Sequence, residues 1–315
     1  LGDVYKRQSV DYSEKILTVK DLEVQFNLRG QVLTAIRGIS LDIYKGESLA
    51  IVGESGSGKS VFTKTFMGML DKNGKVTKGE ILYNGMDLAK FGSEKDWLKI
   101  RGKEVAMVFQ DPMTSLNPLK TVGKQIQEAL ELHQNLHGRA AREKTIEILS
   151  DVGITEPERR YKQYPHEFSG GMRQRAVIAT AIACNPNILI CDEPTTALDV
   201  TIQAQIIELL EQLQKKYRLT IIYITHDLGV VAKVADRIAV MYAGDIIEIG
   251  LCNEIFYNPQ HPYTWALLSS LPQLGIKGEP LYSIHGTPPN LFKEIKGDAF
   301  APRNPRALNI DYVIR

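Results

Sequence analysis

The alternation of apolar and polar residues predicts several β-strands. Over 16–26 and 39–43 the two kinds alternate, which is typical of half-buried antiparallel strands. The segment 79–88 predicts a further strand and turn, and 237–250 predicts two strands around an Ala-Gly turn. Short continuous apolar runs are instead typical of strands buried in a parallel sheet. Such runs, each ending at polar or glycine residues, occupy 48–52, 104–111, 187–194 and 219–227.

Helical periodicity appears between these strands. A helix is expected over 61–70, and the pattern stays helical from 121 to 183. A longer amphipathic helix is predicted over 200–217. The apolar faces of the last two regions comprise Val122, Ile126, Ala129 and Leu130 in one, and Ile202, Ile206, Leu209 and Leu213 in the other. Strands alternating with helices predict an α/β core, and 121–183 looks like an inserted helical subdomain.

The segment GESGSGKS, residues 53–60, follows the buried run SLAIV. Its spacing is that of a phosphate-binding loop. Glycine lets the backbone turn tightly and bring its N–H groups close to a ligand, and the following helix favours an anion. The residues of this loop are Gly53, Glu54, Ser55, Gly56, Ser57, Gly58, Lys59 and Ser60. We expect Lys59 to reach the β- and γ-phosphates of a nucleoside triphosphate and the Ser60 hydroxyl to hold Mg²⁺.

Polar residues end three other predicted strands. Ligands of α/β sheets collect outside the C-terminal ends of strands, so these side chains are candidates for the same site. Asp192 is expected to hold Mg²⁺ through water, and Glu193 to accept a hydrogen bond from an attacking water. His226 ends another strand and is a further candidate for catalysis. Gln110 ends the third strand, where its amide is suited to coordinate Mg²⁺ or to position water.

A second loop of small residues opens a helix within the helical insertion. Ser169, Gly170 and Gly171 lie at its start, where a helix N-terminus attracts anions. The long separation from Gly53 and the place in the insertion argue against one chain bringing both loops to the same phosphate. We therefore expect a second chain to supply this loop.

Composition narrows the functional classes. The 315 residues carry a net charge of +1, which gives no overall electrostatic bias toward nucleic acid. No run approaches the roughly 18 continuous apolar residues that a membrane-spanning helix needs. Cys184, Cys191 and Cys252 show no metal-ligand spacing and are expected to be buried, reduced thiols.

At this point the sequence resembles the ATP-binding subunit of an ABC transporter. The resemblance covers about residues 14–250 and is carried by GESGSGKS, VFQDP, SGGMRQR, ILICDEPTTALD and ITHD, in that order. The segments 111–118, 261–272 and 286–291 resemble the oligopeptide/dipeptide branch, and the match is closest to its D-type subunit. The implied fold is a P-loop NTPase core of ABC type with an antiparallel β subdomain, an inserted helical subdomain and a short C-terminal extension.

The resemblance also implies roles for individual residues. The loop 53–60 becomes the Walker A loop, Asp192 the Walker B aspartate and Glu193 the catalytic glutamate. Further implied roles are the Q-loop glutamine for Gln110, the D-loop aspartate for Asp199, and the switch histidine for His226. Ser169, Gly170, Gly171 and Met172 become the signature motif that binds the γ-phosphate held by a partner subunit. Phe26 is the candidate aromatic that stacks on adenine.

The implied function is ATP hydrolysis that drives import of oligopeptides, at the cytoplasmic face of the cell membrane. The implied partners are a homologous second ATP-binding subunit in a heterodimer, two membrane permease subunits and an extracellular peptide-binding protein, with no nucleic acid. Dipeptides, nickel, glutathione or an antimicrobial peptide remain alternative cargoes. A non-transport ABC protein acting on DNA or ribosomes is a further alternative, against which the single cassette and the absence of a basic stripe argue.

Domain boundaries follow from the same resemblance. We expect residues 1–13 to be non-native or disordered, 14–250 to form the nucleotide-binding domain with its helical subdomain at about 111–183, and 251–315 to form a truncated C-terminal extension. Many relatives bind an iron–sulfur cluster there through cysteines. Asp298 and Asn304 replace two of these cysteines and Asp311 is expected to replace a third, so we expect no cluster.

Overall fold

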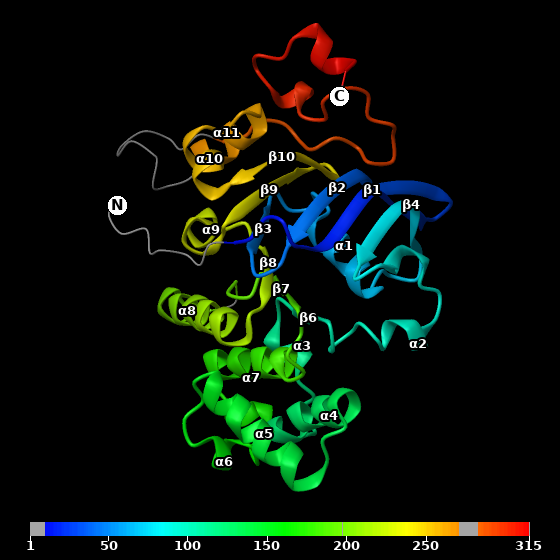
Figure 1. Ribbon diagram of the computed structural model, residues 1–315. Coiled ribbons are helices and arrows are strands. Elements are labelled where there is room, and N and C mark those ends of the chain that lie inside the picture. The colour runs from blue at the N-terminus through cyan, green and yellow to red at the C-terminus, as the bar shows by residue number, and fades with distance from the viewer. Residues whose placement is uncertain (1–9, 197, 271–282, 315) are drawn as a thin grey trace.

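The computed structural model describes residues 10–196, 198–270 and 283–314 (Figure 1). Two sheets form its centre. The first is antiparallel, with the strand order β2-β1-β4-β5. Its strands are β1 (Lys15–Leu28), β2 (Gln31–Tyr44), β4 (Gly74–Tyr83) and β5 (Met86–Asp87). The alternation predicted over 16–26 and 39–43 is confirmed, because β1 and β2 pair antiparallel and bury alternate residues.

The second sheet has six strands in the order β10-β9-β3-β8-β7-β6. The five from β9 to β6 run parallel, and β10 is an antiparallel edge strand. Its strands are β3 (Ser48–Val52), β6 (Val105–Val108), β7 (Ile188–Asp192), β8 (Thr220–Ile224), β9 (Arg237–Tyr242) and β10 (Asp245–Leu251). The predicted buried strands are thus confirmed, and each lies with apolar side chains packed on both faces of the sheet.

The helix after the phosphate loop is shorter than the predicted 61–70. It consists of α1 (Lys59–Lys64) and one 3₁₀ turn, η1 (Thr65–Met67). Gly68 ends it with φ +59°, and a Cβ there would lie 2.1 Å from the ring of Trp97. The close approach of this ring requires glycine and turns the chain out of the helix. Trp97 ends the short helix α2 (Glu94–Trp97), which follows the 3₁₀ turn η2 (Leu88–Lys90).

The helical subdomain projects from the parallel sheet and is drawn in green at the bottom of Figure 1. Its elements are α3 (Pro112–Ser115), α4 (Val122–Gln134), α5 (Gly138–Asp151), α6 (Pro157–Arg160), η3 (Pro165–Glu167) and α7 (Gly170–Ile182). Val122, Ile126 and Leu130 share one buried face of α4, as their spacing predicts. The core they join is continuous with the apolar residues beneath the sheet.

Two more helices cover the parallel sheet. The first is α8 (Val200–Tyr217), whose bounds are those predicted from its periodicity, and the second is α9 (Leu228–Val234). Ile206, Leu209 and Leu213 bury the apolar face of α8, whereas Ile202 at its start is half-buried. No helix of the described residues is long and apolar enough to cross a membrane.

The C-terminal extension lies beyond β10 and returns over the cassette (Figure 1). It contains α10 (Cys252–Tyr257), α11 (Pro262–Ser269), η5 (Ala301–Arg303) and η6 (Asn309–Tyr312). Phe300 packs against Tyr242 of β9 and Tyr263 of α11, with ring centroids 5.5 and 5.3 Å apart. These rings are buried, so ordinary packing attaches the extension to the parallel sheet.

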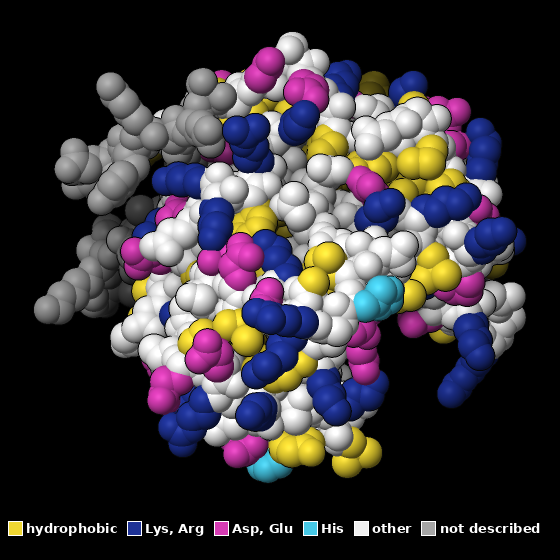
Figure 2. Space-filling view, turned by 60° about the horizontal axis from the view of Figure 1, so that its bottom comes forward, with side chains coloured by type: hydrophobic (Ala, Val, Ile, Leu, Met, Phe, Trp, Pro, Cys, Tyr) yellow, Lys and Arg dark blue, Asp and Glu magenta, His cyan; other side chains and the backbone are white. Residues whose placement is uncertain are grey.

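Residues 1–9, the larger part of the segment expected to be non-native or disordered, lie outside the described residues. Tyr12, within that segment, packs edge-on against Tyr44, with ring centroids 5.2 Å apart. Figure 2 shows basic and acidic side chains interspersed over the face turned to the viewer, without a continuous basic stripe.

Candidate nucleotide-binding site

The parallel sheet brings the predicted site residues to one edge. β3, β6, β7 and β8 are parallel neighbours, so their C-terminal ends lie on the same side. Gly53 follows β3, Asp192 ends β7, Gln110 comes shortly after β6, and His226 comes shortly after β8. The topology therefore explains why side chains far apart in the sequence meet at this edge.

The phosphate loop depends on glycine at two close approaches. A Cβ on Gly53, which has φ +150°, would lie 2.1 Å from the carbonyl oxygen of Met241. A Cβ on Gly58, with φ +100°, would lie 3.0 Å from the carbonyl oxygen of Ala35. The loop is thus pressed against β9 and β2, and side chains at these glycines would force it to move.

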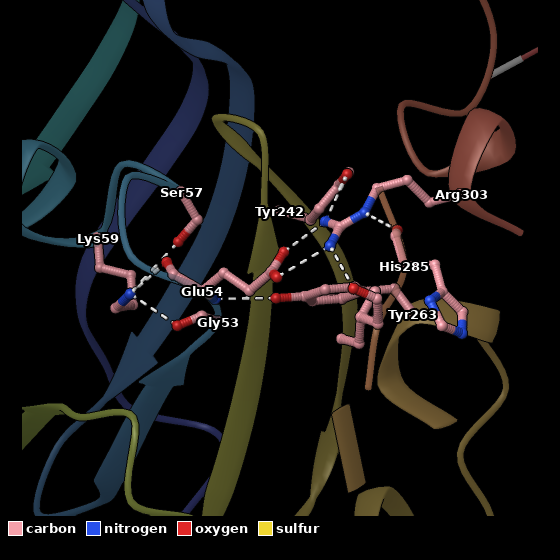
Figure 3. A network of polar contacts seen from close by, with 9 residues as sticks. Gly53, Glu54, Ser57, Lys59, Tyr242, Tyr263, His285 and Arg303 are labelled. Atoms are coloured by element: carbon pink, nitrogen blue, oxygen red, sulfur yellow. Dashed lines mark hydrogen bonds and ion pairs between the residues drawn. The ribbon is translucent and has the colours of Figure 1, made fainter. Parts of the chain in front are cut away.

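Lys59 is buried beneath the phosphate loop and stabilises the conformation of the loop (Figure 3). Its Nζ donates hydrogen bonds of 2.8 Å to the carbonyl oxygens of both Gly53 and Glu54. Burial lowers the pKa of Lys59, although nearby carboxylates, Glu193 first, oppose the shift. The hydrogen bonds described for its ammonium go to uncharged oxygens, so a phosphate would give this buried cation a direct anionic partner.

Ser60 and Asp192 form an oxygen pair next to Lys59. The Ser60 hydroxyl donates to Asp192 Oδ1 over 3.2 Å. Burial raises the pKa of Asp192, and the hydrogen bond from Ser60 opposes this rise. A half-buried carboxylate beside a hydroxyl is the hard-oxygen donor set that Mg²⁺ prefers, so these two residues fit the ion.

Glu193 lies at the centre of a polar network. Its carboxylate accepts hydrogen bonds from Gln110 Nε2 over 2.9 Å and from Thr196 Oγ1 over 3.0 Å. His226 Nδ1 lies 3.2 Å from the other carboxylate oxygen. Glu193 has φ +46°, and its N–H donates to the carbonyl oxygen of Ile224 on the neighbouring strand. A non-glycine residue in this conformation is held by its surroundings, which here aim the side chain between three loops.

The second glycine loop belongs to a different part of the molecule. Ser169 caps α7 by accepting a hydrogen bond from the Met172 N–H over 3.4 Å. Gly170 and Gly171 face Leu198 and Ile202, so the loop packs on the start of α8. Asp199 caps α8 through the Ile202 N–H over 3.0 Å. Figure 1 shows the start of α7 in the helical subdomain, apart from β3 and α1.

Phe26 occupies a place in the core of the antiparallel sheet. Its side chain is 9% exposed, and its ring lies so close to Gly74 of β4 that a Cβ there would be 2.4 Å away. The described contacts of Phe26 are those of a packed core residue. Its stacking on adenine stays a prediction.

Several contributors to the site were not predicted. Thr196 supports Glu193, and Gln203 of α8 donates to the carbonyl oxygens of Thr195 and Leu198, which fixes the loop before α8. The third is Arg303, which pairs with Glu54 of the phosphate loop. Thr196 lies in the ILICDEPTTALD motif, and Arg303 in the stretch compared with the cysteine pattern. Neither sequence pattern indicates these contacts.

The positions compared with cluster-binding cysteines make local hydrogen bonds instead. Asp298 accepts from the Phe300 N–H, Asn304 from the Arg306 N–H, and Asp311 from the Leu308 N–H. Within the described residues, no group of three or more His, Cys, Asp or Glu side chains is arranged to hold a metal ion. The three positions thus have roles in shaping turns.

Comparison with models of known protein families shows which family this chain belongs to. Residues 36–196 match the ABC transporter family, and residues 247–310 match the oligopeptide/dipeptide transporter C-terminal region. The chain belongs to the ABC transporter family. The cassette match ends within the segment that joins β7 to α8, and the second match covers most of the extension.

Relatives of this ABC protein agree with the two matches. The oligopeptide transport ATP-binding protein AmiE of Streptococcus pneumoniae is 59% identical over 94% of this chain and 84% of its own length. OppD of Bacillus subtilis, also an oligopeptide transport ATP-binding protein, is 57% identical over 95% of this chain and 84% of its own length. DppD of Lactococcus lactis, a dipeptide transport ATP-binding protein, is 55% identical over 95% and 86%.

A solved structure of an ABC cassette also resembles this chain. It is the ATP-binding cassette MJ0796 in a dimeric, post-hydrolysis state bound to ADP and phosphate. The match has a TM-score of 0.66 and 29% identity, and it covers 75% of this chain and 98% of that one. The fold is therefore that of an ABC ATPase, as the sequence predicts.

Proposed function

We propose that this ABC protein is the ATP-hydrolysing subunit of an oligopeptide importer. The observation that carries the proposal is the meeting of Lys59, Ser60, Asp192 and Glu193 at one sheet edge, in a chain that also bears the peptide-transporter C-terminal region. The names of the relatives, which are peptide transport ATP-binding proteins, support the cargo.

In the proposed reaction the loop 53–60 binds the phosphates of ATP through its backbone N–H groups and Lys59. Ser60 and Asp192 would hold Mg²⁺, with the Gln110 amide nearby, and the ion would offset charge on the β- and γ-phosphates. Glu193 accepts a hydrogen bond from the attacking water and orients it in line with the γ-phosphate. His226, 3.2 Å from Glu193, contacts the γ-phosphate from the same edge.

A second cassette completes the proposed site. Ser169, Gly170, Gly171 and Met172 form the start of α7, a helix that lies in the helical subdomain and apart from β3 and α1 (Figure 1). We assign this loop to the γ-phosphate held by a homologous partner subunit, in a heterodimer. Asp199 caps the start of α8 beside this loop, which supports assigning it to the same proposed interface between cassettes.

The other partners follow from the transporter assignment. Two permease subunits in the membrane would hold the pair of cassettes at the cytoplasmic face, and an extracellular protein would deliver the peptide. Gln110, which contacts Glu193, is suited to report on the membrane subunits. The interspersed charges in Figure 2 and the net charge of +1 argue against a nucleic acid partner.

The proposed function is tested with the reconstituted transporter in lipid. ATP hydrolysis is measured with the peptide-binding protein and either dipeptides or peptides of about five residues, a length that tests the oligopeptide assignment. We expect the loaded binding protein to stimulate hydrolysis severalfold, and the longer peptides to be the better activators. A hydrolysis rate unchanged by the binding protein would contradict the proposed function. Stimulation by dipeptides alone would contradict the oligopeptide cargo.

A further inference from the structure

An ion pair joins the C-terminal extension to the phosphate loop (Figure 3). Arg303 of η5 binds Glu54 with both terminal nitrogens of its guanidinium, over 2.6 Å to Oε2 and 3.1 Å to Oε1. The Arg303 side chain is only 4% exposed, and 28% of the Glu54 side chain is exposed. A bidentate, shielded pair of this kind fixes geometry far better than an exposed salt bridge.

The guanidinium is itself held in place. Its Nε donates to the carbonyl oxygen of His285 over 2.9 Å, and a terminal nitrogen donates to that of Ile284 over 3.3 Å. A further bond of 3.2 Å reaches the hydroxyl of Tyr242. Because the extension and β9 supply these contacts, Arg303 meets Glu54 as a rigid partner.

Glu54 is fixed at each of its polar groups. Its carboxylate pairs with Arg303, and its N–H donates to the hydroxyl of Tyr263 over 2.8 Å. Its carbonyl oxygen accepts the 2.8 Å hydrogen bond from Lys59. Two of these partners, Arg303 and Tyr263, belong to the C-terminal extension, and Lys59 is the residue proposed to bind phosphate. Glu54 therefore links the extension to Lys59.

Charge gives this contact a consequence for nucleotide binding. Glu54 is an acidic residue in a loop that receives a highly anionic ligand. An unpaired carboxylate there would repel phosphate and would compete for the ammonium of Lys59. The guanidinium of Arg303 offsets that charge and directs the carboxylate toward the extension, on the side away from Lys59 (Figure 3).

We infer that the C-terminal extension is a working part of the nucleotide site, in which Arg303 is a positioning residue that acts on ATP binding through Glu54. Tyr263 supports the same residue from α11. The inference rests on the proposed binding of ATP by the loop 53–60 and adds a remote segment to that site.

The test measures the affinity for Mg·ATP by calorimetry and the KM and kcat of hydrolysis. The variants are Arg303→Met, Glu54→Gln and the double variant, with Arg306→Met as a matched control because Arg306 is an exposed arginine of the same segment. Arg303→Met should weaken ATP binding about tenfold, a coupling typical of residues in one hydrogen-bonded network. KM should rise more than kcat falls, and Arg306→Met should bind as the unaltered protein does.

The double variant separates positioning from simple attachment of the extension. Once Glu54 is neutral, no unpaired carboxylate remains, so Arg303→Met with Glu54→Gln should recover most of the lost affinity. Arg303→Lys, which keeps the charge but not the fork geometry, should fall between the unaltered protein and Arg303→Met, and it serves if Arg303→Met fails to fold.

Two results would overturn the inference. One is full affinity in Arg303→Met, or full affinity in Arg303→Lys if Arg303→Met does not fold. The other is a double variant as weak as Arg303→Met, which would show that Arg303 only anchors the extension. An unaltered protein that does not bind ATP would instead refute the proposed function.

Discussion

Gln110 donates a hydrogen bond from its Nε2 to Glu193 Oε2 over 2.9 Å, and so joins the loop after β6 to the end of β7. The same carboxylate also contacts Thr196 and His226, which makes Glu193 the point where three loops meet. A movement of any of these loops would therefore shift Glu193, the residue proposed to orient water. Under the proposed mechanism, this contact would let the region beside the helical subdomain affect hydrolysis.

Removing this contact should affect turnover more than binding. In Gln110→Ala the Glu193 carboxylate loses one fixed donor, so we expect kcat to fall on the order of tenfold while the KM for ATP changes little. Steady-state hydrolysis of the two proteins measures both quantities. Thr196→Val, which removes a different donor to the same carboxylate, is the matched comparison and should reduce kcat in the same direction. An unchanged kcat in both variants would show that these contacts do not position Glu193.

The phosphate loop predicts a difference between two glycines. Gly53→Ala places a methyl group against the carbonyl oxygen of Met241, so the loop must shift and ATP affinity should fall by at least about tenfold. Gly30 has φ +83° with nothing within 4 Å of a built Cβ, so Gly30→Ala should cost only about 1–2 kcal/mol of backbone strain. Calorimetric ATP titration and thermal unfolding of both variants test this. Equal ATP affinities for the two would refute the steric argument.

The Ser60–Asp192 pair predicts a dependence on Mg²⁺. Chelation of Mg²⁺ should abolish hydrolysis, and added Mg²⁺ should restore it. Asp192→Asn removes the ionised oxygen next to Ser60, so the Mg²⁺ concentration needed for half-maximal hydrolysis should rise about tenfold or more, as expected when a ligand charge is lost. Asp71→Asn, at an exposed aspartate, is the control. A Mg²⁺ requirement unaffected by Asp192→Asn would remove Asp192 from the metal site.

The extension should contain no iron–sulfur cluster. Asp298, Asn304 and Asp311 cap turns with hydrogen bonds, and oxygen or amide groups do not replace thiolates as cluster ligands. Protein purified without oxygen should therefore contain neither stoichiometric iron nor acid-labile sulfide. Finding both in a fixed ratio to protein would contradict this expectation.

Local patterns predict elements well where packing and periodicity agree. The bounds of α8 follow from its apolar face, and the parallel strands follow from short apolar runs. The helix after the phosphate loop was overestimated because its end depends on Trp97, which packs on Gly68 from a different segment. Periodicity within one segment carries no information about such a partner.

The same limit separates the site residues that could be predicted from the sequence from those that could not. Residues at strand ends could be found from the sequence because parallel topology brings those ends together. Arg303 could not, because its contact with Glu54 joins residues 249 positions apart and depends on how the extension folds back over β9. Phe26, the aromatic expected to stack on adenine, lies in the core of the antiparallel sheet, and its stacking stays a prediction.

The central claim is that Glu193 drives hydrolysis of ATP held by the loop 53–60, and Glu193→Gln tests it most directly. This variant keeps the size of the side chain but removes its charge and leaves it one acceptor oxygen. Its affinity for Mg·ATP and its turnover are compared with those of Glu208→Gln, an exposed position on α8. The account predicts near-normal ATP affinity and a loss of turnover of about a hundredfold or more, the range of a lost general base. Turnover close to that of Glu208→Gln would contradict it.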